Sequence, residues 1–320
     1  MIDLTTESQR TMNTPTIDIK GLHVRHGKLE AVSGLDLRAL PGRVLGLLGP
    51  NGAGKTTTLQ ALVGMIHFQG GSGTVLGCPL GKMKSADFTK LGYVSEGQHI
   101  PKQWTVTRLL NYLRPLYPTW DEPYCQQLLK AYELPMNRPM AAFSRGQAMK
   151  AKLIAALAYR PELLLLDEPF SGLDAVVRED FIDGLLQLMS GGEWTVVITS
   201  HELDEMERLC DDVCLLANGK AVLNEPLTSV QARFRRWEII LPANTKGPLQ
   251  PIPDEWLQFR QQMNHIRFVD SGFNEVTSLE TVTQTFGPVQ SAESHPLSLR
   301  EIYVALVRTT TTSITETAAA

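Results

Sequence analysis

The segment Gly49–Thr57 restricts the fold of this 320-residue chain more than any other part of the sequence. It reads GPNGAGKTT, which matches the pattern of a glycine, any four residues, Gly-Lys and then Ser or Thr. It follows the apolar run Arg43–Leu48 and precedes a run whose composition suits a helix. Glycines let several backbone N–H groups converge on one small anion without a clash from Cβ atoms. The segment therefore predicts a strand, a phosphate-binding loop and a helix in that order, rather than a chance glycine-rich turn.

The polar residues of this loop suit the binding of phosphate. The helix that begins near Gly54 would direct its positive N-terminal end toward the anion. Lys55 would neutralise the outer phosphates, and the hydroxyl of Thr56 would ligate Mg²⁺.

A second segment, Leu163–Pro169, is an apolar run that ends in Asp-Glu-Pro. Asp167, at the carboxyl end of such a strand, would hold Mg²⁺ beside the loop, and Glu168 would polarise the attacking water. Taken alone, the pattern also fits an ordinary core strand that ends at an acidic residue. Together with Gly49–Thr57, it favours a site for a nucleoside triphosphate and Mg²⁺.

Runs rich in β-branched and aliphatic residues alternate with helical patterns along the chain. The expected strands are Ile17–Val24, Arg43–Leu48, Leu163–Leu166, Thr195–Thr199 and Val213–Leu216, and the expected helices include Gln147–Tyr159 and Val176–Met189. Several of these strands are continuously apolar, which is typical of strands covered on both faces. The order of the elements predicts an α/β domain with a largely parallel sheet.

Two parts of the chain have a different pattern. The part from Pro101 to Phe143 shows no convincing strand, and helical spacing at Val106–Leu113 and Glu122–Tyr132 predicts a helical insert at about 100–145, with Asp121 as an N-cap. After Phe234, the strand-like runs Trp237–Leu241 and Ile266–Val269 and the helical run Ser298–Val307 predict a small α+β unit. The expected division is a flexible N-terminus at 1–15, a main domain at 16–234, an accessory unit at 235–308 and a disordered Thr/Ala-rich tail at 309–320.

Composition excludes several classes of protein. The 30 basic and 34 acidic residues give a net charge of −4, which does not support nucleic acid as the main partner. No apolar run reaches the roughly 18–20 residues that a membrane-spanning helix needs, and the polar N-terminus does not resemble a secretion signal. The four cysteines fit structural thiols in a reduced cytoplasm better than a zinc site.

Four further motifs accompany the two phosphate-site segments. They are Gly92–Glu96 (GYVSE), Ser144–Gln147 (SRGQ), Ser171–Asp174 (SGLD) and Thr199–Glu202 (TSHE). In this order, the motifs resemble those of the ATP-binding cassette (ABC) ATPase family over about Thr16–Arg233. The resemblance implies a P-loop NTPase core with a helical subdomain that hydrolyses ATP with Mg²⁺.

The resemblance also implies roles for single residues. Glu168 would be the general base, His201 would contact the γ-phosphate and position the water, and Lys55 would bind the phosphates. The implied Mg²⁺ ligands are Thr56, Asp167 and Glu96. The implied nucleotide-binding residues are Gly49, Pro50, Asn51, Gly52, Ala53, Gly54, Lys55, Thr56, Thr57, His26, Glu96, Ser144, Gly146, Gln147 and Asp174.

In the family, two cassettes enclose two ATP molecules, and the resemblance implies a second cassette here, most simply another copy of this chain, with a different cassette as the alternative. Ser144 and the backbone of Gly146 would then approach the γ-phosphate bound by the other subunit, and Asp174 would communicate across the dimer. Three residues depart from the family pattern: Arg145 replaces a glycine, Glu96 stands where Gln is commoner, and His26 stands where an aromatic residue usually stacks on adenine. His26 fits either a smaller stacking surface or an exposed loop residue.

The resemblance further implies a membrane partner in a separate chain. The chain would be the cytoplasmic ATPase subunit of a bacterial ABC transporter, peripheral on the inner face of the membrane through its permease. The pattern Leu299–Tyr303 resembles tails of the exporter branch. The aromatic residues of the helical insert would line a groove for a short permease helix, or would fill the core of the insert; they are Trp104, Tyr112, Tyr117 and Trp120.

Two other functions remain open on the sequence. One is an ABC ATPase that acts on ribosomes or DNA, although the single cassette and the lack of coiled-coil insertions disfavour it. The other is a regulatory module that binds ATP and hydrolyses it weakly, in line with the three departures. The accessory unit would serve dimer contact or regulation, or be a structural appendage.

Overall fold

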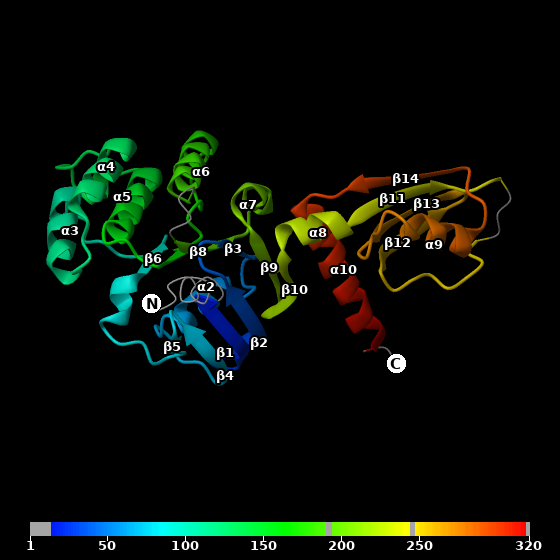
Figure 1. Cartoon of the computed structure of the whole chain (residues 1–320), viewed down its shortest axis with the longest axis horizontal. Coiled ribbons are helices and arrows are strands. Elements are labelled where there is room, and N and C mark those ends of the chain that lie inside the picture. The colour runs from blue at the N-terminus through cyan, green and yellow to red at the C-terminus, as the bar shows by residue number, and fades with distance from the viewer. Residues whose placement is uncertain (1–13, 190–193, 244–246, 318–320) are drawn as a thin grey trace, which may run out of the picture. The chain divides into compact units, whose positions relative to one another are not determined.

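A computed structural model describes residues 14–189, 194–243 and 247–317 (Figure 1). The flexible N-terminus expected at 1–15 therefore lies almost entirely outside the described residues. The chain divides into two compact units. The first unit extends to Glu202 and also takes in Leu209–Asn224, and the second consists of Leu203–Arg208 and the chain from Glu225 onward.

A six-stranded sheet with the order β10-β9-β3-β8-β7-β6 forms the centre of the first unit. Its strands are β3 (Val44–Leu48), β6 (Leu91–Ser95), β7 (Leu163–Asp167), β8 (Thr195–Ser200), β9 (Asp212–Ala217) and β10 (Lys220–Pro226). Strand β3 runs parallel to β8 and β9, and β7 runs parallel to β6 and β8. Every residue of β3, β7 and β8 is buried, which explains why these strands are largely apolar. The predicted α/β fold with a parallel sheet is confirmed.

The parallel strands bring the predicted site motifs to one edge of the sheet. Leu48 at the end of β3 lies opposite Ser200, and Asp167 at the end of β7 lies opposite Thr199. Ser95, the last residue of β6, also lies opposite Asp167. Because the carboxyl ends of parallel strands meet at the same edge, the segments that follow β3, β6, β7 and β8 converge there.

A second, antiparallel sheet in this unit has the order β2-β1-β4-β5. Its strands are β1 (Ile17–His26), β2 (Leu29–Ala39), β4 (Gly70–Val75) and β5 (Cys78–Pro79). Helix α2 (Lys55–Leu62) contributes Leu59 and Leu62 to a core that also includes Ile19 of β1 and Leu165 of β7. The helix that follows the phosphate-binding loop is therefore fixed by apolar packing from both sheets.

The helical part of the first unit includes helices at the expected positions Val106–Leu113 and Glu122–Tyr132. Its elements are η1 (Asp87–Lys90), α3 (Val106–Leu113), η2 (Arg114–Leu116), α4 (Glu122–Tyr132), η3 (Met140–Ala142), α5 (Arg145–Leu157) and α6 (Ala175–Met189). The side chain of Thr105 caps α3 by accepting from the Arg108 N–H at 3.1 Å. Asp121 caps α4 by accepting from the Tyr124 N–H at 2.9 Å, as expected from the sequence.

The second unit contains a four-stranded antiparallel sheet with the order β12-β13-β11-β14. Its elements are α7 (Leu203–Leu209), α8 (Leu227–Arg233), β11 (Arg235–Ile240), β12 (Trp256–Gln262), β13 (His265–Asp270), α9 (Thr277–Phe286), β14 (Ser291–Pro296) and α10 (Leu299–Thr317). One face of the sheet, with Trp237 and Phe268, packs on Val282 and Phe286 of α9 to form a separate core. This arrangement matches the expected small α+β unit.

The bounds of the second unit differ from the expectation in two ways. The unit begins near Glu225 rather than at 235, since Arg233 of α8 forms an ion pair with Glu225 at 2.6 Å and donates to the Ser271 carbonyl. Helix α10 continues to Thr317 where a disordered tail is expected at 309–320, because no Gly or Pro interrupts the run; 318–320 lie outside the described residues.

Within the described ranges, no helix has the length and apolar character needed to cross a membrane. The four cysteines are free thiols, and burial raises the pKa of Cys214 to about 12, so this thiol stays protonated at neutral pH.

Candidate functional site

The phosphate-binding loop joins β3 to α2 and requires glycine at two positions. Gly49 has a φ of +153°, and a Cβ built there would lie 2.4 Å from the Leu216 carbonyl oxygen. Gly54, the residue before α2, has a φ of +102°, and its Cβ would lie 2.4 Å from the Ala31 carbonyl oxygen. Any side chain at these positions would push the loop away from neighbouring backbone, so the glycines keep the loop close to the sheet edge.

Lys55 connects this loop to the end of β7. Its ammonium group donates to the carbonyl oxygens of Gly49 at 2.7 Å and Pro50 at 3.1 Å. The same group forms an ion pair with Oε1 of Glu168 at 2.9 Å, and the lysine side chain is only 5% exposed. A buried cation is thus held above the loop, where it can bind an anionic ligand.

Asp167 is buried at the end of β7 and accepts hydrogen bonds from three hydroxyl groups. Thr56 Oγ1 and Thr199 Oγ1 each lie 2.8 Å from Asp167 Oδ1, and the Tyr93 hydroxyl lies 3.4 Å from Oδ2. Burial, followed by the nearby charge of Asp167, raises the pKa of Tyr93 to about 12, so this hydroxyl remains a donor.

The pairing of Thr56 with Asp167 fits a site for Mg²⁺. A hydroxyl oxygen and a carboxylate oxygen already face each other at 2.8 Å next to the phosphate-binding loop. Among the described residues, no group of three or more His, Cys, Asp or Glu could hold a metal by itself. Mg²⁺ is usually bound by one or two protein oxygens together with waters and substrate phosphates, and Thr56 and Asp167 can supply such oxygens.

Glu168 lies between Lys55 and His201. Its Oε1 pairs with the Lys55 ammonium, and its Oε2 lies 2.8 Å from Nδ1 of His201. The backbone of Glu168 has a φ of +50°, and its N–H donates to Thr199 Oγ1 at 2.9 Å. A non-glycine residue in this region is strained by about 1–3 kcal/mol, and such strain is found most often at functional sites. The turn directs this carboxylate toward the loop.

His26 lies beside the phosphate-binding helix. Its Nε2 is 3.3 Å from Oγ1 of Thr57, and the histidine is exposed at the end of β1. This geometry fits an imidazole that stacks on a base next to the loop, which the resemblance implies. It fits equally well an exposed residue with one polar contact.

The signature residues form the start of helix α5. Ser144 Oγ accepts from the Gln147 N–H at 3.2 Å, and Gln147 Oε1 accepts from the Ser144 N–H at the same distance, which is a capping box. Gly146 is buried against α6, since a Cβ there would lie 2.5 Å from Val177 Cγ1. Ser144 remains exposed at this helix start. The hydrogen bonds of Ser144 and Gln147 are therefore local to α5.

Arg145 and Asp174 lie at the junction of α5 and α6. A Cβ on Gly172, which has a φ of +67°, would meet the Arg145 guanidinium at 2.0 Å, so the arginine packs against this glycine. Asp174 Oδ1 accepts from the Val177 N–H at 3.0 Å. The departure at Arg145 thus brings a cation to the Ser171–Asp174 segment.

Glu96 follows β6 and is exposed. Its backbone carbonyl and that of Ser95 accept from the Lys152 ammonium at 2.9 Å and 2.8 Å. Burial lowers the pKa of Lys152. Lys152 of α5 thus holds the backbone of this loop in place. The Glu96 carboxylate forms no hydrogen bond with Thr56 or Asp167, the other predicted Mg²⁺ ligands.

Three residues of the site were missed by sequence reasoning: Tyr93, Thr199 and Lys152. Thr199 could have been found, because it is the next-to-last residue of β8, the strand beside β7, and precedes His201 by two residues. Tyr93 and Lys152 carry no such signal, because their contacts depend on how β6, β7 and α5 pack.

A groove of about 400 Å³ lies at the helical part of the first unit. Its lining includes Trp104, Tyr112, Tyr117 and Lys152. The rings of Trp104 and Tyr112 are 5.2 Å apart, and Tyr112 is 57% exposed. Trp120, the fourth aromatic residue that the sequence singles out, instead donates to Glu122 at 2.9 Å.

Comparison with known proteins agrees with this geometry. A family model described as ABC transporter matches residues 32–171. The Nod factor export ATP-binding protein I of Rhizobium etli is 33% identical over 220 residues, which cover 67% of this chain and 69% of that protein. The uncharacterized ABC transporter ATP-binding protein YhaQ of Bacillus subtilis is 28% identical over 289 residues, which cover 87% and 94%. The chain covers 64% of the length of a third relative.

A solved structure of an ATP-binding subunit of an ABC transporter has the same fold. It superimposes with a TM-score of 0.61 at 22% identity, covering 68% of this chain and 92% of that chain. The fold and the loop geometry define a P-loop cassette that binds ATP. The chain belongs to the ATP-binding proteins of ABC transporters, a family whose members hydrolyse ATP and work with membrane permease components.

Proposed function

We propose that this chain is the Mg²⁺-dependent ATPase subunit of an exporter and drives a permease that is a separate chain. The observation that most supports hydrolysis is the contact series Lys55–Glu168–His201, which lies directly beside the Thr56–Asp167 pair. It combines a cation for the phosphates, a carboxylate for the water and an imidazole that orients the carboxylate. The similarity to a Nod factor export protein supports the direction of transport.

Lys55 pairs with Glu168 and would also bind the triphosphate, and this double role suggests how substrate would activate Glu168. The lysine ammonium lies 2.9 Å from the Glu168 carboxylate in a site of low exposure. The triphosphate has a larger negative charge and would compete for the ammonium group. Glu168 would then keep only His201 as a close partner, and its carboxylate could accept a proton from the attacking water.

Thr56 and Asp167 are the residues proposed to hold Mg²⁺, which would neutralise charge on the phosphates. Lys55 and the loop backbone would bind the phosphates directly. Glu96 is proposed to join them only when its exposed carboxylate turns toward the site. The exposed Ser144 at the start of α5 would complete the site of a second copy of this chain, because its hydroxyl accepts from the Gln147 N–H and can still donate its own proton to a phosphate at this helix N-terminus.

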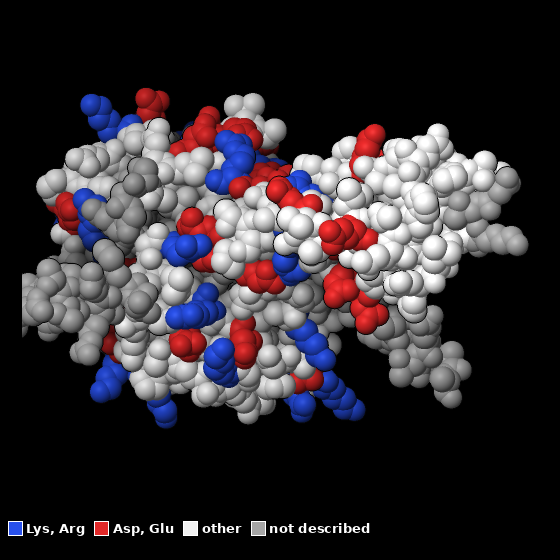
Figure 2. All heavy atoms as spheres, turned by 45° about the vertical axis from the view of Figure 1, so that its right-hand side comes forward, with Lys and Arg blue, Asp and Glu red and all other residues white. Residues whose placement is uncertain are grey.

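The aromatic groove is proposed as the contact with the permease at the inner face of the membrane. Tyr112 exposes 57% of its surface beside Trp104, so an apolar helix could be buried there at little cost in polar desolvation. The alternative of a nucleic-acid partner finds no support on the face drawn in Figure 2, where acidic and basic side chains are mixed and neither sign dominates.

A weakly hydrolysing regulatory module remains the second candidate. The observation that favours it is the packing of Arg145 on Gly172, which places a guanidinium where the family has a glycine. Steady-state turnover separates the two, because a transport ATPase should hydrolyse ATP faster when its permease is present.

The proposal is tested by co-expressing the chain with its permease and purifying the complex in detergent. We expect Mg-ATP hydrolysis that EDTA abolishes and that the permease stimulates. Tyr112→Ala should reduce co-purification of the permease, whereas Leu249→Ala, at a 71% exposed residue of the second unit, should not. Co-purification with ribosomes instead of the permease would contradict the proposal.

A further inference from the structure

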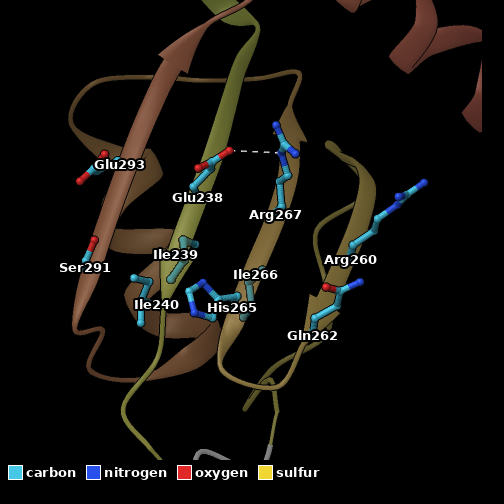
Figure 3. A pocket seen from close by; sticks show the side chains of 10 residues that line it. All are labelled: Glu238, Ile239, Ile240, Arg260, Gln262, His265, Ile266, Arg267, Ser291 and Glu293. Atoms are coloured by element: carbon cyan, nitrogen blue, oxygen red, sulfur yellow. Dashed lines mark ion pairs between the residues drawn. The ribbon is translucent and has the colours of Figure 1, made fainter.

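The sheet of the second unit has one face covered by α9 and another face that is partly open (Figure 3). Four charged residues form a single row across the open face, one from each strand. Glu238 lies directly opposite Glu293 of β14 on one side and Arg267 of β13 on the other. Arg267 in turn lies opposite Arg260 of β12. We call Glu293, Glu238, Arg267 and Arg260, in this spatial order, the charge row.

The charge row is accessible and lies at a hollow in the sheet surface. The side chains of Arg267 and Glu238 are 59% and 52% exposed. The hollow has a volume of about 460 Å³ and is lined by all four residues of the row. Helix α10 occupies the neighbouring part of this face, where Glu301 pairs with Arg236 at 2.9 Å. The row therefore begins where the cover by α10 ends.

The order of charges in the row is unfavourable within one unit. The central pair, Glu238 and Arg267, is an ion pair at 3.2 Å. The outer neighbours, Glu293 beside Glu238 and Arg260 beside Arg267, have like charges directly opposite on adjacent strands, which destabilises a sheet. An external surface with the reverse order of charges would remove this cost.

A second copy of the same row supplies that reverse order. A two-fold axis parallel to the strands, between β11 and β13, would place two such sheets face to face. Each glutamate would then face an arginine of the other copy, because the row reads acid, acid, base, base. Because α10 covers the neighbouring end of this face, the two sheets would stand farther apart than the about 10 Å of directly stacked sheets, and the long Arg and Glu side chains of the row would reach across the gap. In a two-fold contact every pairing occurs twice, so Glu238 with Arg267 and Glu293 with Arg260 would give four pairs of opposite charge.

The adjacent row on the same face permits this stacking. It consists of Ser291, Ile240, His265 and Gln262, which lie opposite one another across the four strands. It contains no carboxylate or guanidinium that would face a like charge in the second copy. Ile240 is partly exposed and adds apolar area at the centre.

We propose that the second units of two copies dock through the charge row, so that Glu238 faces Arg267 and Glu293 faces Arg260 across the contact. This contact needs no nucleotide and is separate from the ATP-dependent association proposed for the first unit. It would hold two cassettes in one assembly between rounds of hydrolysis.

Charge reversal tests the contact in the full-length protein without nucleotide. Arg260→Glu with Arg267→Glu makes the row entirely acidic, and Glu238→Arg with Glu293→Arg makes it entirely basic. In sedimentation equilibrium at low salt, we expect each double variant to self-associate at least about tenfold more weakly than the wild type. An equimolar mixture of the two should recover association, because an acidic row then faces a basic one.

Lys20→Glu with Lys28→Glu is the matched control for the acidic variant, since it lowers the net charge by the same amount at exposed positions of the first unit. Circular dichroism of each variant verifies folding. The control should associate like the wild type. The proposal fails if the wild type is monomeric at low salt, if the acidic variant associates as strongly as the wild type, or if the mixture does not associate. ATP hydrolysis by the wild type is unaffected by any of these outcomes, so the proposed function stands or falls separately.

Discussion

At the residue scale, Asp167 and Glu168 are neighbours in the sequence with different surroundings. Asp167 is the last residue of a buried strand and is held by the hydroxyls of Thr56 and Thr199. Glu168 turns out of the strand with a positive φ and contacts Lys55 and His201. The end of the strand gives the two carboxylates different surroundings, so that Asp167 is suited to bind a cation and Glu168 is suited to accept a proton.

The glycines of the phosphate-binding loop provide a prediction at the same scale. Gly54→Ala should lower the free energy of unfolding by roughly 3 kcal/mol, because its Cβ would meet the Ala31 carbonyl oxygen at 2.4 Å in addition to the strain of a positive φ. Gly52→Ala should cost only roughly 1 kcal/mol, since its φ is +82° and no atom lies within 4 Å of the new Cβ. Urea unfolding measures both, and equal losses would show that the close approach has no energetic effect.

At the element scale, sequence patterns located the elements whose signals are local. Helices α3 and α4 match their predicted bounds because a cap residue and an apolar face mark each of them. Strand β4 (GGSGTV) was missed, because glycine-rich segments usually indicate loops. Its pairing with β1 requires glycine: a Cβ on Gly73 would lie 1.9 Å from the Asp18 carbonyl oxygen. That requirement arises only when the two strands meet.

The residues of the site were predictable where they belong to local sequence motifs. Lys55, Thr56, Asp167, Glu168 and His201 follow motifs with fixed spacing, and the structure brings them together. The contacts that involve Tyr93 and Lys152 depend on packing between elements far apart in the sequence. The hydrogen bond that the Lys152 ammonium donates to the backbone carbonyl of Glu96 is an example, since it joins residues 56 positions apart.

The start of α10 provides a prediction at the element scale. The Ser298 N–H, and then the Arg236 guanidinium, hold the pKa of Glu301 below its ordinary value of 4.5. A lowered pKa means that the stabilisation is complete above 4.5 and disappears as the pH falls through the folded-state value. Glu301→Gln should therefore reduce stability at neutral pH, and its difference from the wild type should shrink in acid.

Urea unfolding of the wild type and Glu301→Gln, at neutral pH and at steps below 4.5, measures this difference. Glu280→Gln on α9 controls for the loss of one exposed carboxylate. A difference that stays constant with pH would mean that the capping contacts of Glu301 contribute no pH-dependent stability.

At the scale of the whole molecule, the chain combines two units with different chemistry. The first unit holds the phosphate-binding loop at the edge of a parallel sheet and an aromatic groove in its helical part. The second unit presents the charge row on an antiparallel sheet. In our account, ATP is hydrolysed in the first unit, and the second unit keeps two copies of the chain together.

The central claim is that Glu168 is the base for ATP hydrolysis. The most direct measurement compares steady-state Mg-ATP turnover and ATP binding in the wild type and in Glu168→Gln. The amide keeps the size of the side chain and cannot accept the proton, so we expect turnover to fall by about 10²-fold or more with ATP binding retained. Full turnover by Glu168→Gln would contradict the account.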